Sequence, residues 1–289
     1  MHKHQSNSIK NIKVAFFLNL SFTLFELIGG YYTNSMAIIS DALHDFGDSI
    51  SLGTSWYLEK KSRKDKDNNF SFGYQRFSLL GALINSVVLI SGSLYVLSVI
   101  IPRIINPVHS NAQGMLVFAI VGIMVNGIAV LRLKSGSSLN EKLVSWHLLE
   151  DVLGWFAVLI VSVVLIFKDI PVLDPLLSLL IIIYVLFNVI KNLKKTMHIF
   201  LQGTPSGISI DKIEDNILKL DKVLSVHHTK VWSLDGEKNV LTIHLVIDKI
   251  ESFHEMLTIK YNVKEILKTI PISHATIEIE FADETCYMD

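Results

Sequence analysis

Two histidine–aspartate pairs with the same spacing, His44-x-x-x-Asp48 and His147-x-x-x-Asp151, lie inside long apolar stretches of the sequence. On a helix the side chains at positions i and i+4 are neighbours, so each pair can converge on one ion. Two such pairs facing each other would supply two imidazole nitrogens and two carboxylate oxygens, a set suited to tetrahedral Zn²⁺. The two aspartates also balance the charge of a divalent ion, which makes its burial less costly. The pairs therefore predict a metal site.

Three more acidic residues accompany these pairs: Asp41, Asp45 and Glu150. An ionisable group in mid-membrane costs roughly 2.5–3.5 kcal/mol even on lenient insertion scales, so a group kept there usually has a role. These residues could orient the metal ligands, relay protons or face a water-filled vestibule, and their spacing does not decide between these roles.

The apolar stretches that carry the pairs are long enough to cross a membrane. Of the 289 residues, 50% are hydrophobic and 18% are charged, against roughly 25% charged residues in soluble domains. A spanning helix needs about 20 mostly apolar residues. Six segments meet this requirement: 14–32, 36–58, 77–101, 112–133, 143–167 and 171–192.

The distribution of basic residues predicts the orientation of these spans. The N-terminus, the second and fourth loops and the exit from the sixth span carry fifteen Lys and Arg, whereas the three opposite loops carry only Arg103 and Lys168. By the positive-inside rule both termini are cytoplasmic. Residues 1–13 are too polar for a signal-peptide core, so the first apolar segment is expected to remain as a span. The short loops and the lack of a targeting signal favour a bacterial plasma membrane.

The remainder of the chain is expected to be a small α+β domain. Helical periodicity covers 209–220 and 252–269, and alternating patterns predict strands at 223–234, 238–248 and 274–282. The predicted order is α-β-β-α-β, with the helices on one face of the sheet. The predicted domains are a cytoplasmic N-terminal segment (1–13), a six-span all-α membrane domain (14–195), a linker (196–207) and a cytoplasmic domain (208–289), which we call the tail.

Composition excludes some partners. The formal net charge of −1 gives no basic surface for nucleic acid, and no small organic substrate is indicated. The single cysteine, Cys286, cannot form an internal disulfide. A third pair with the same spacing, His244 and Asp248, lies in a predicted strand, where four residues span about 13 Å, so these two side chains cannot share an ion.

Several longer motifs are similar to those of the cation diffusion facilitator family. They are NSMAIISDALHDFGDSISL (34–52), FGYQRFSLLGALIN (72–85), HLLEDVLGWFAVLI (147–160), DPLLSLL (174–180), LQGTPSGISI (201–210) and VHHTKVWSLDG (226–236). The resemblance is collinear over nearly the whole chain. It implies a homodimeric exporter of divalent metal in the lipid bilayer, with proton counterflow and a ferredoxin-like cytoplasmic domain.

Carried over residue by residue, the family's transport site falls on His44, Asp48, His147 and Asp151. Histidine at the first position resembles the zinc branch, and imidazole suits zinc better than manganese. Cadmium and cobalt stay open as cargo, and a range extending to manganese and iron is the broader alternative. The chain departs from the family pattern at Ser78 and Gln202, where glutamate is common, and its second loop has no histidine.

The resemblance also implies that the tail is a regulatory and dimerisation domain with a metal site that binds zinc. The family's positions fall on His227, His244, His254, Glu278 and Glu280, and His228, His274 and Cys286 are further candidates.

Other functions remain open at this level. A membrane metalloenzyme could also place histidine and aspartate in helices, but the sequence has no H-E-x-x-H motif and no clustered histidine boxes. A receptor would bind zinc at the same residues without net flux. A carrier of alkali metals would prefer sites made of oxygen alone.

Overall fold

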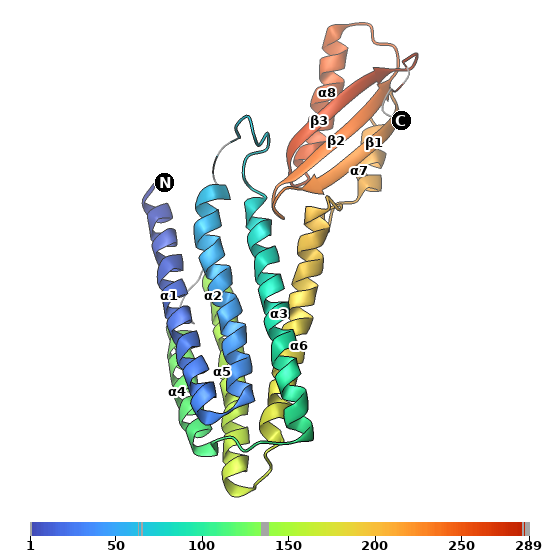
Figure 1. Ribbon diagram of the computed structural model, residues 1–289. Helices are drawn as coiled ribbons and strands as arrows, with labels where there is room; N and C mark the ends of the chain where they lie inside the picture. The colour runs from blue at the N-terminus through green and yellow to red at the C-terminus, as the bar shows by residue number, and fades with distance from the viewer. Residues whose placement is uncertain (1, 63, 65, 134–138, 285, 287–289) are drawn as a thin grey trace. The chain divides into compact units, whose positions relative to one another are not determined.

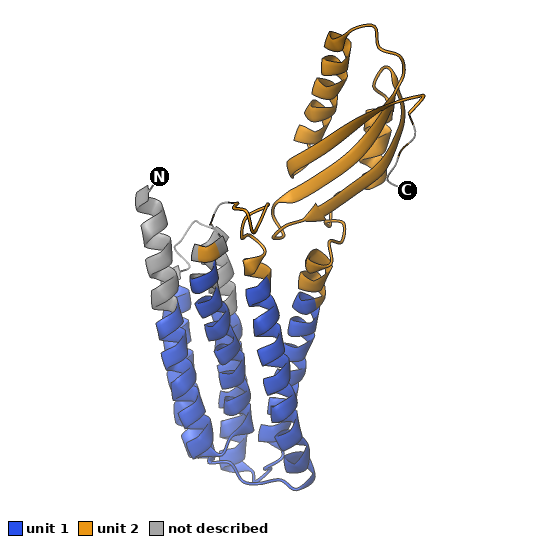
Figure 2. Cartoon of the chain, turned by 45° about the horizontal axis from the view of Figure 1, so that its top comes forward, with its two compact units in different colours: residues 1–60, 80–193 blue, residues 61–79, 194–289 orange. Residues whose placement is uncertain are grey.

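The computed structural model describes residues 2–62, 64, 66–133, 139–284 and 286, except for the side chains of residues 2–15, 55, 56, 59, 60, 62, 132, 133 and 139–147. The chain divides into two compact units (Figure 2). We call residues 1–60 and 80–193 the helical unit, and residues 61–79 and 194–289 the sheet unit.

Six long helices make up most of the helical unit, and they run alongside one another in Figure 1. Their order confirms the six predicted apolar segments. Most bounds differ by four residues or fewer, but the first helix begins twelve residues earlier than predicted and the sixth ends eight residues later. The sixth begins at Leu173, two residues later than expected, because residues 170–173 form a turn. The helices are α1 (His2–Thr33), α2 (Met36–Ser62), α3 (Phe77–Ile105), α4 (Ala112–Leu133), α5 (Leu139–Phe167) and α6 (Leu173–Phe200).

Length and composition separate these helices into two groups. Within the described residues, four of them, α3 to α6, are long and apolar enough to cross a membrane. Large apolar side chains such as Leu94, Leu153 and Phe187 are more than half exposed, as expected of a surface that faces hydrocarbon. The helix α2 is equally long but carries three aspartates in its middle, which lower its mean hydropathy.

Small residues let the helices approach closely. A Cβ placed on Gly122 of α4 would lie 2.2 Å from the ring of Trp155 on α5, so glycine is needed for this contact. Trp155 is fully buried beside Ile38 of α2 and Met115 of α4 in one hydrophobic cluster. This cluster joins α2 to α4 and α5, the helix that carries the second predicted metal pair.

The sheet unit contains three strands and two short helices in the predicted order α-β-β-α-β. The expected bounds hold to within two residues. The elements are α7 (Ile210–Leu218), β1 (Val223–Ser233), β2 (Asn239–Ile247), α8 (Phe253–Lys268) and β3 (Ile272–Phe281). Serine side chains cap both helices, since Ser209 accepts a hydrogen bond from Lys212 N and Ser252 accepts one from Glu255 N.

The sheet has the strand order β1-β2-β3, with β1 and β2 antiparallel and β2 and β3 parallel. The predicted hairpin at Asp235-Gly236 is present. Gly236 has φ +100°, and Asp235 Oδ1 accepts hydrogen bonds from the backbone amides of Glu237 and Lys238. The parallel pair needs a long connection, which α8 provides.

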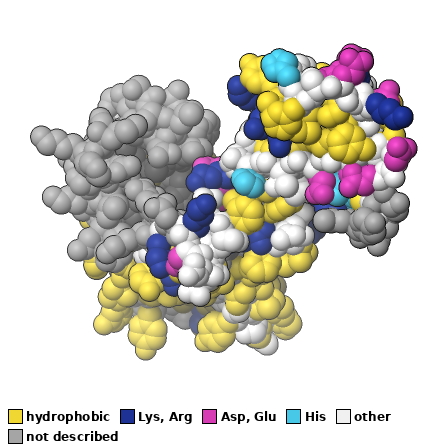
Figure 3. Space-filling view, turned by 90° about the horizontal axis from the view of Figure 1, so that it is seen from above, with side chains coloured by type: hydrophobic (Ala, Val, Ile, Leu, Met, Phe, Trp, Pro, Cys, Tyr) yellow, Lys and Arg dark blue, Asp and Glu magenta, His cyan; other side chains and the backbone are white. Residues whose placement is uncertain are grey.

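Side-chain alternation gives the sheet two different faces. The odd-numbered residues of β2, Leu241 to Ile247, lie in one core with the buried faces of α7 and α8, so both helices cover the same face (Figure 1). The even-numbered residues of β2, including His244, point to the other face, which we call the open face of the sheet. Figure 3 shows charged side chains of both signs interspersed with hydrophobic ones over the sheet unit, a surface suited to water.

Candidate functional site

The helix α2 presents the predicted polar stripe along one side. His44 Nε2 lies 3.8 Å from Asp48 Oδ2, so this pair is adjacent, as its i,i+4 spacing predicted. Both side chains are about one quarter exposed. Asp41 and Asp45 are buried, with 7% and 4% of their surface exposed. The stripe therefore has an accessible His–Asp pair and two enclosed acids.

The helix α5 brings one member of the second pair to this stripe. Asp151 is buried and interacts electrostatically with Asp41. A Cβ placed on Gly154, one turn further along α5, would lie 3.5 Å from Asp41 Oδ1, which shows how closely the two helices approach. The side chain of His147 lies outside the described residues. Three of the four predicted ligands are thus placed on neighbouring helices, and the complete set stays a prediction.

Glu150, the third additional acid, is not part of this group. Its side chain is exposed, and its Oε1 accepts a hydrogen bond from the hydroxyl of Tyr184 on α6. Neighbouring positions on a helix point about 100° apart, so Glu150 and Asp151 face different surroundings.

A fifth carboxyl, that of Glu26 on α1, was not among the predicted site residues. Glu26 has no exposed surface, and it interacts electrostatically with Asp45, Asp41 and Asp151. The sequence did contain a signal, an ionisable residue inside an apolar segment. Nothing in the local sequence shows that α1 places this residue beside the acids of α2 and α5.

Asp174, at the start of α6, holds the beginning of α2. Its carboxylate accepts hydrogen bonds from Ser35 Oγ (2.5 Å), Met36 N (2.7 Å), Ala37 N (3.2 Å) and Ser110 Oγ (3.2 Å). An acid at a helix N-terminus satisfies amides that have no partner within the helix and interacts favourably with the helix dipole. Asp174 therefore fixes the end of the helix that carries His44 and Asp48.

The open face of the sheet contains a second group of potential metal ligands. Within the described residues, ligand atoms of His227, His244, Glu280 and Cys286 all lie within 4.8 Å of one another. Glu280 bridges the two histidines, with Oε1 2.6 Å from His244 Nδ1 and Oε2 3.2 Å from His227 Nε2. Cys286 Sγ lies 3.8 Å from His244 Nδ1. We call these four residues the tail cluster.

The charge state of Glu280 reflects these contacts. Burial acts to raise the pKa of Glu280, but the hydrogen bonds from His244 and Cys286, together with the charges of the two histidines, lower it overall. Glu280 is therefore held as a carboxylate, the form that binds a metal ion.

A bulge in β1 adds His228 to the edge of the tail cluster. The register between β1 and β2 shifts by one residue between His227 and Lys230, and His228 has φ +49°. Consecutive strand residues normally point to opposite faces. Because of the bulge, the rings of His227 and His228 lie 5.4 Å and 5.2 Å from the ring of His244.

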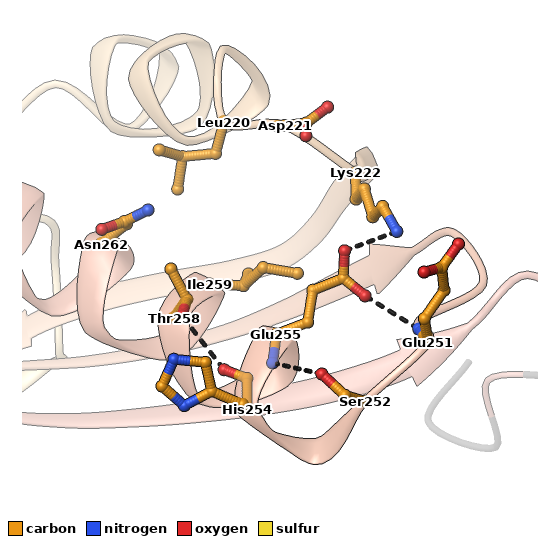
Figure 4. Close-up of a pocket in the computed structure, with 10 residues that line it drawn as sticks. All are labelled: Leu220, Asp221, Lys222, Glu251, Ser252, His254, Glu255, Thr258, Ile259 and Asn262. Atoms are coloured by element: carbon orange, nitrogen blue, oxygen red, sulfur yellow. Dashed lines mark hydrogen bonds and ion pairs between the residues drawn. The ribbon is translucent and has the colours of Figure 1, made fainter.

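The other predicted tail residues lie elsewhere. Glu278 is exposed on the open face and lines a cavity of about 320 Å³ with His228 and His244. His254 lies at the start of α8, in a groove of about 400 Å³ that Glu251 and Glu255 also line (Figure 4). In this groove Glu255 is engaged by Lys222 and by the backbone amide of Glu251. Within one chain, three of the five predicted tail residues thus lie together, and Cys286 lies with them.

The donor set of the tail cluster suits zinc. Two imidazoles, one carboxylate and one thiol are the side chains that bind Zn²⁺ in tetrahedral sites. The ligand atoms lie within 4.8 Å of one another, a spacing compatible with their binding one ion.

Comparisons with known proteins agree with both units. The cation efflux transmembrane domain family matches residues 12–201, and the cytoplasmic domain family of cation efflux proteins matches residues 205–282.

Individual relatives cover nearly the whole chain. A cadmium, cobalt and zinc/H(+)-K(+) antiporter of Bacillus subtilis (strain 168) is 32% identical over 284 residues, which cover 96% of this chain and 91% of that protein. The metal cation efflux system protein CzcD of Cupriavidus metallidurans is 30% identical over 97% of this chain and 89% of its own. The zinc transporter ZitB of Escherichia coli (strain K12) is 27% identical over 97% and 90%.

These matches confirm the fold expected from the sequence, a helical membrane domain followed by a cytoplasmic α+β domain. They also favour a transporter over a membrane enzyme. The paired acids and histidines of α2 and α5 lie in a protein whose whole length matches metal exporters. The chain belongs to the cation efflux family, the cation diffusion facilitators.

Proposed function

We propose that this chain exports Zn²⁺ from the cytoplasm, with His44, Asp48, His147 and Asp151 as the ligands of the transported ion. The observation that carries the proposal is the juxtaposition of α2 and α5, in which Asp41 and Asp151 interact within an apolar helical unit. Ionisable groups in such surroundings usually mark an ion pathway. Zinc is the preferred cargo because imidazole and carboxylate together suit it. Relatives named for cadmium and cobalt make a broader range the alternative.

Transport is coupled to counterflow of protons in this proposal. Histidine and aspartate must be deprotonated to bind metal, so loading of the site releases protons and protonation promotes release of the metal. Histidine titrates near pH 6.5, where a physiological proton gradient can act. Alternating exposure of α2 and α5 to the two sides of the membrane would then exchange zinc for protons.

Orientation, membrane and assembly are part of the proposal. Both termini are cytoplasmic in this proposal, because fifteen basic residues lie on their side of the membrane and only two on the other. The bacterial relatives favour the plasma membrane. The match of residues 205–282 to the family's cytoplasmic domain favours a homodimer joined through the tail.

The tail cluster would be the regulatory site. His227, His244, Glu280 and Cys286 would hold one zinc ion, which when bound supplies an electrostatic link between the three strands and the C-terminal segment. His254 does not join this cluster within one chain, so its part in metal binding, like that of Glu278, stays a prediction.

Zinc flux into proteoliposomes tests the transport proposal. Vesicles would hold the purified full chain, a zinc dye and a pH dye, with a proton gradient as the driving force. We expect zinc to move opposite to protons, and Asp151→Ala to abolish the movement while leaving the protein folded. A receptor that binds zinc without transport would show zinc binding and no flux in folded wild-type protein, and that result would overturn the proposal.

Calorimetric titration of the full chain tests the tail cluster. In the Asp151→Ala background, which removes the transport site, we expect His244→Ala to lose a bound zinc ion. The matched control is His274→Ala, since His274 contacts Phe72 and lies outside the cluster. Equal zinc binding by both variants would show that the tail cluster holds no zinc.

A further inference from the structure

The acids of the helical unit outnumber the charge of one transported metal ion. In the proposed site a divalent ion is balanced by Asp48 and Asp151. Glu26, Asp41 and Asp45 are then left over, and all three are buried. The sequence segments 16–33, 36–58 and 148–167, from which all five acids come, contain no lysine or arginine.

Glu26 is the most enclosed of these acids. It has no exposed surface, and neither of its carboxyl oxygens completes a hydrogen bond within the described part of the chain. The polar side chain that approaches it is another carboxyl, Asp45, and its electrostatic interactions with Asp41 and Asp151 are also with acids. The carboxyl of Glu26 is thus directed toward Asp41, Asp45 and Asp151.

Within the described residues, no lysine or arginine is among the groups that interact with Glu26. The helix α4, which packs against α1, contributes apolar contacts there, such as Phe118 against Phe25. The only basic residue of α4 is Arg132, in its last turn. The groups that face Glu26 are Asp41 and Asp45 from α2 and Asp151 from α5.

Acids that face each other in a low-dielectric interior cannot all stay charged without a cation among them. We propose that Glu26 binds the monovalent counter-cation of the exchange, a proton or a potassium ion, beside the transported metal. Asp41 and Asp45 favour the cation there through their negative field. This inference rests on the proposed exchange of zinc for a counter-ion and adds the residue that carries the counter-ion.

The closeness of the two sites supplies the coupling. A divalent ion at Asp151 repels a monovalent cation at Glu26, so each ion weakens the binding of the other. Such linkage is reciprocal: the counter-cation entering at Glu26 promotes release of zinc by the same factor. Two adjacent sites that disfavour simultaneous occupancy are what an obligatory exchanger requires.

The variant Glu26→Gln tests this assignment, because it keeps the shape of the side chain and removes its charge. The full chain in proteoliposomes would be driven either by a pH gradient at equal potassium or by a potassium gradient at equal pH. Whichever of the two gradients drives zinc transport by the wild type identifies the counter-cation. A second assay measures exchange of zinc for zinc with no other gradient, which needs the metal site but not the counter-ion.

We expect Glu26→Gln to bind zinc and exchange zinc for zinc like the wild type, and to lose gradient-driven transport about tenfold, within the usual range of coupling between sites. The control Glu150→Gln removes an exposed carboxylate of the same unit and should keep gradient-driven transport. Gradient-driven transport by Glu26→Gln at the wild-type rate would overturn the inference. Wild-type protein that neither gradient drives would instead refute the proposed function.

The variant Glu26→Asp decides the matter if Glu26→Gln does not fold. It retains a carboxyl that is one methylene shorter and therefore sits differently among the other acids. We expect it to remain coupled but to need a higher concentration of the counter-cation for half-maximal transport, because the shortened carboxyl is displaced from its place in the site. An unchanged counter-cation dependence would overturn the inference.

Discussion

At the scale of residues, metal selectivity rests on the types of the donor atoms. The proposed transport site mixes nitrogen and oxygen donors, whereas Glu26 and its neighbours offer oxygen alone. Imidazole favours zinc, and carboxylate favours harder cations such as manganese. Adjacent sites of different composition can therefore serve two different ions.

Replacing His44 with aspartate should change this selectivity. The substitution exchanges a nitrogen donor for an oxygen donor, so we expect the preference for zinc over manganese to fall by about tenfold or more. Competition between the two metals in the flux assay measures the ratio. The control is Asp48→Glu, which retains oxygen at the neighbouring position. An unchanged zinc preference in His44→Asp would contradict the assignment of His44 as a ligand.

At the scale of elements, the site depends on how the start of α2 is held. Asp174 binds its first turn. At the other end, residues 61–79 belong to the sheet unit. In this segment Asp67 accepts hydrogen bonds from Lys64 Nζ, the hydroxyl of Tyr74 and the amides of Asn69 and Phe70. Asp174 thus organises the start of α2, and Asp67 organises the segment that follows the helix.

Replacing Asp174 with alanine should loosen the start of α2. The change leaves two backbone amides and the hydroxyl of Ser35 without their acceptor in a buried place, at a cost of about 3 kcal/mol. We expect a lower midpoint of thermal unfolding in detergent, and a smaller loss for Ser178→Ala, which removes one hydrogen bond to Ser40. Equal midpoints for Asp174→Ala and the wild type would show that this contact does not stabilise α2.

The segment around Asp67 should withstand mild acid. The hydrogen bonds from Lys64 and Tyr74 hold the pKa of Asp67 well below its usual range. A lowered folded-state pKa gives a contribution that is complete above the unfolded value of about 3.9 and is lost as pH falls through the folded value. We expect the amide NMR signals of Asn69 and Phe70 to stay unchanged down to about pH 4.

The amide signals of Asn69 and Phe70 also test whether Asp67 is the group that titrates. In Asp67→Asn they should lose their pH dependence below pH 4, because the titrating group has been removed. A midpoint at or above about 4 in the wild type would contradict the lowered pKa of Asp67.

At the scale of the whole molecule, the chain combines a membrane unit that would transport metal with a water-facing unit that would sense it. The tail cluster draws its ligands from β1, β2, β3 and the segment after β3, so metal binding there would tie together parts far apart in sequence. With such a sensing role, the concentration of cytoplasmic metal would regulate transport.

Removing residues 205–289 tests whether the tail senses metal while the helices transport it. A chain that ends at residue 204 keeps the six long helices, so we expect it to retain zinc transport but to lose stimulation by cytoplasmic zinc and to dissociate more readily into monomers. Light scattering and flux at several zinc concentrations measure the two effects. Full-length Glu280→Gln is the control, with intact dimers and reduced stimulation. Wild-type zinc stimulation of the truncated chain would rule out the sensing role.

The sequence by itself determined the order of the elements, because helix and strand periods and the lengths of apolar runs are local properties. It also identified the spacing of His44 and Asp48, since positions i and i+4 of a helix are always adjacent. Tertiary structure decided which distant residues meet. Glu26 joins the acids because α1 packs against α2, and His228 turns toward His244 because β1 has a bulge. Cys286 reaches His244 because the chain returns after β3. Contacts of this kind depend on packing and strand register, which no local pattern encodes.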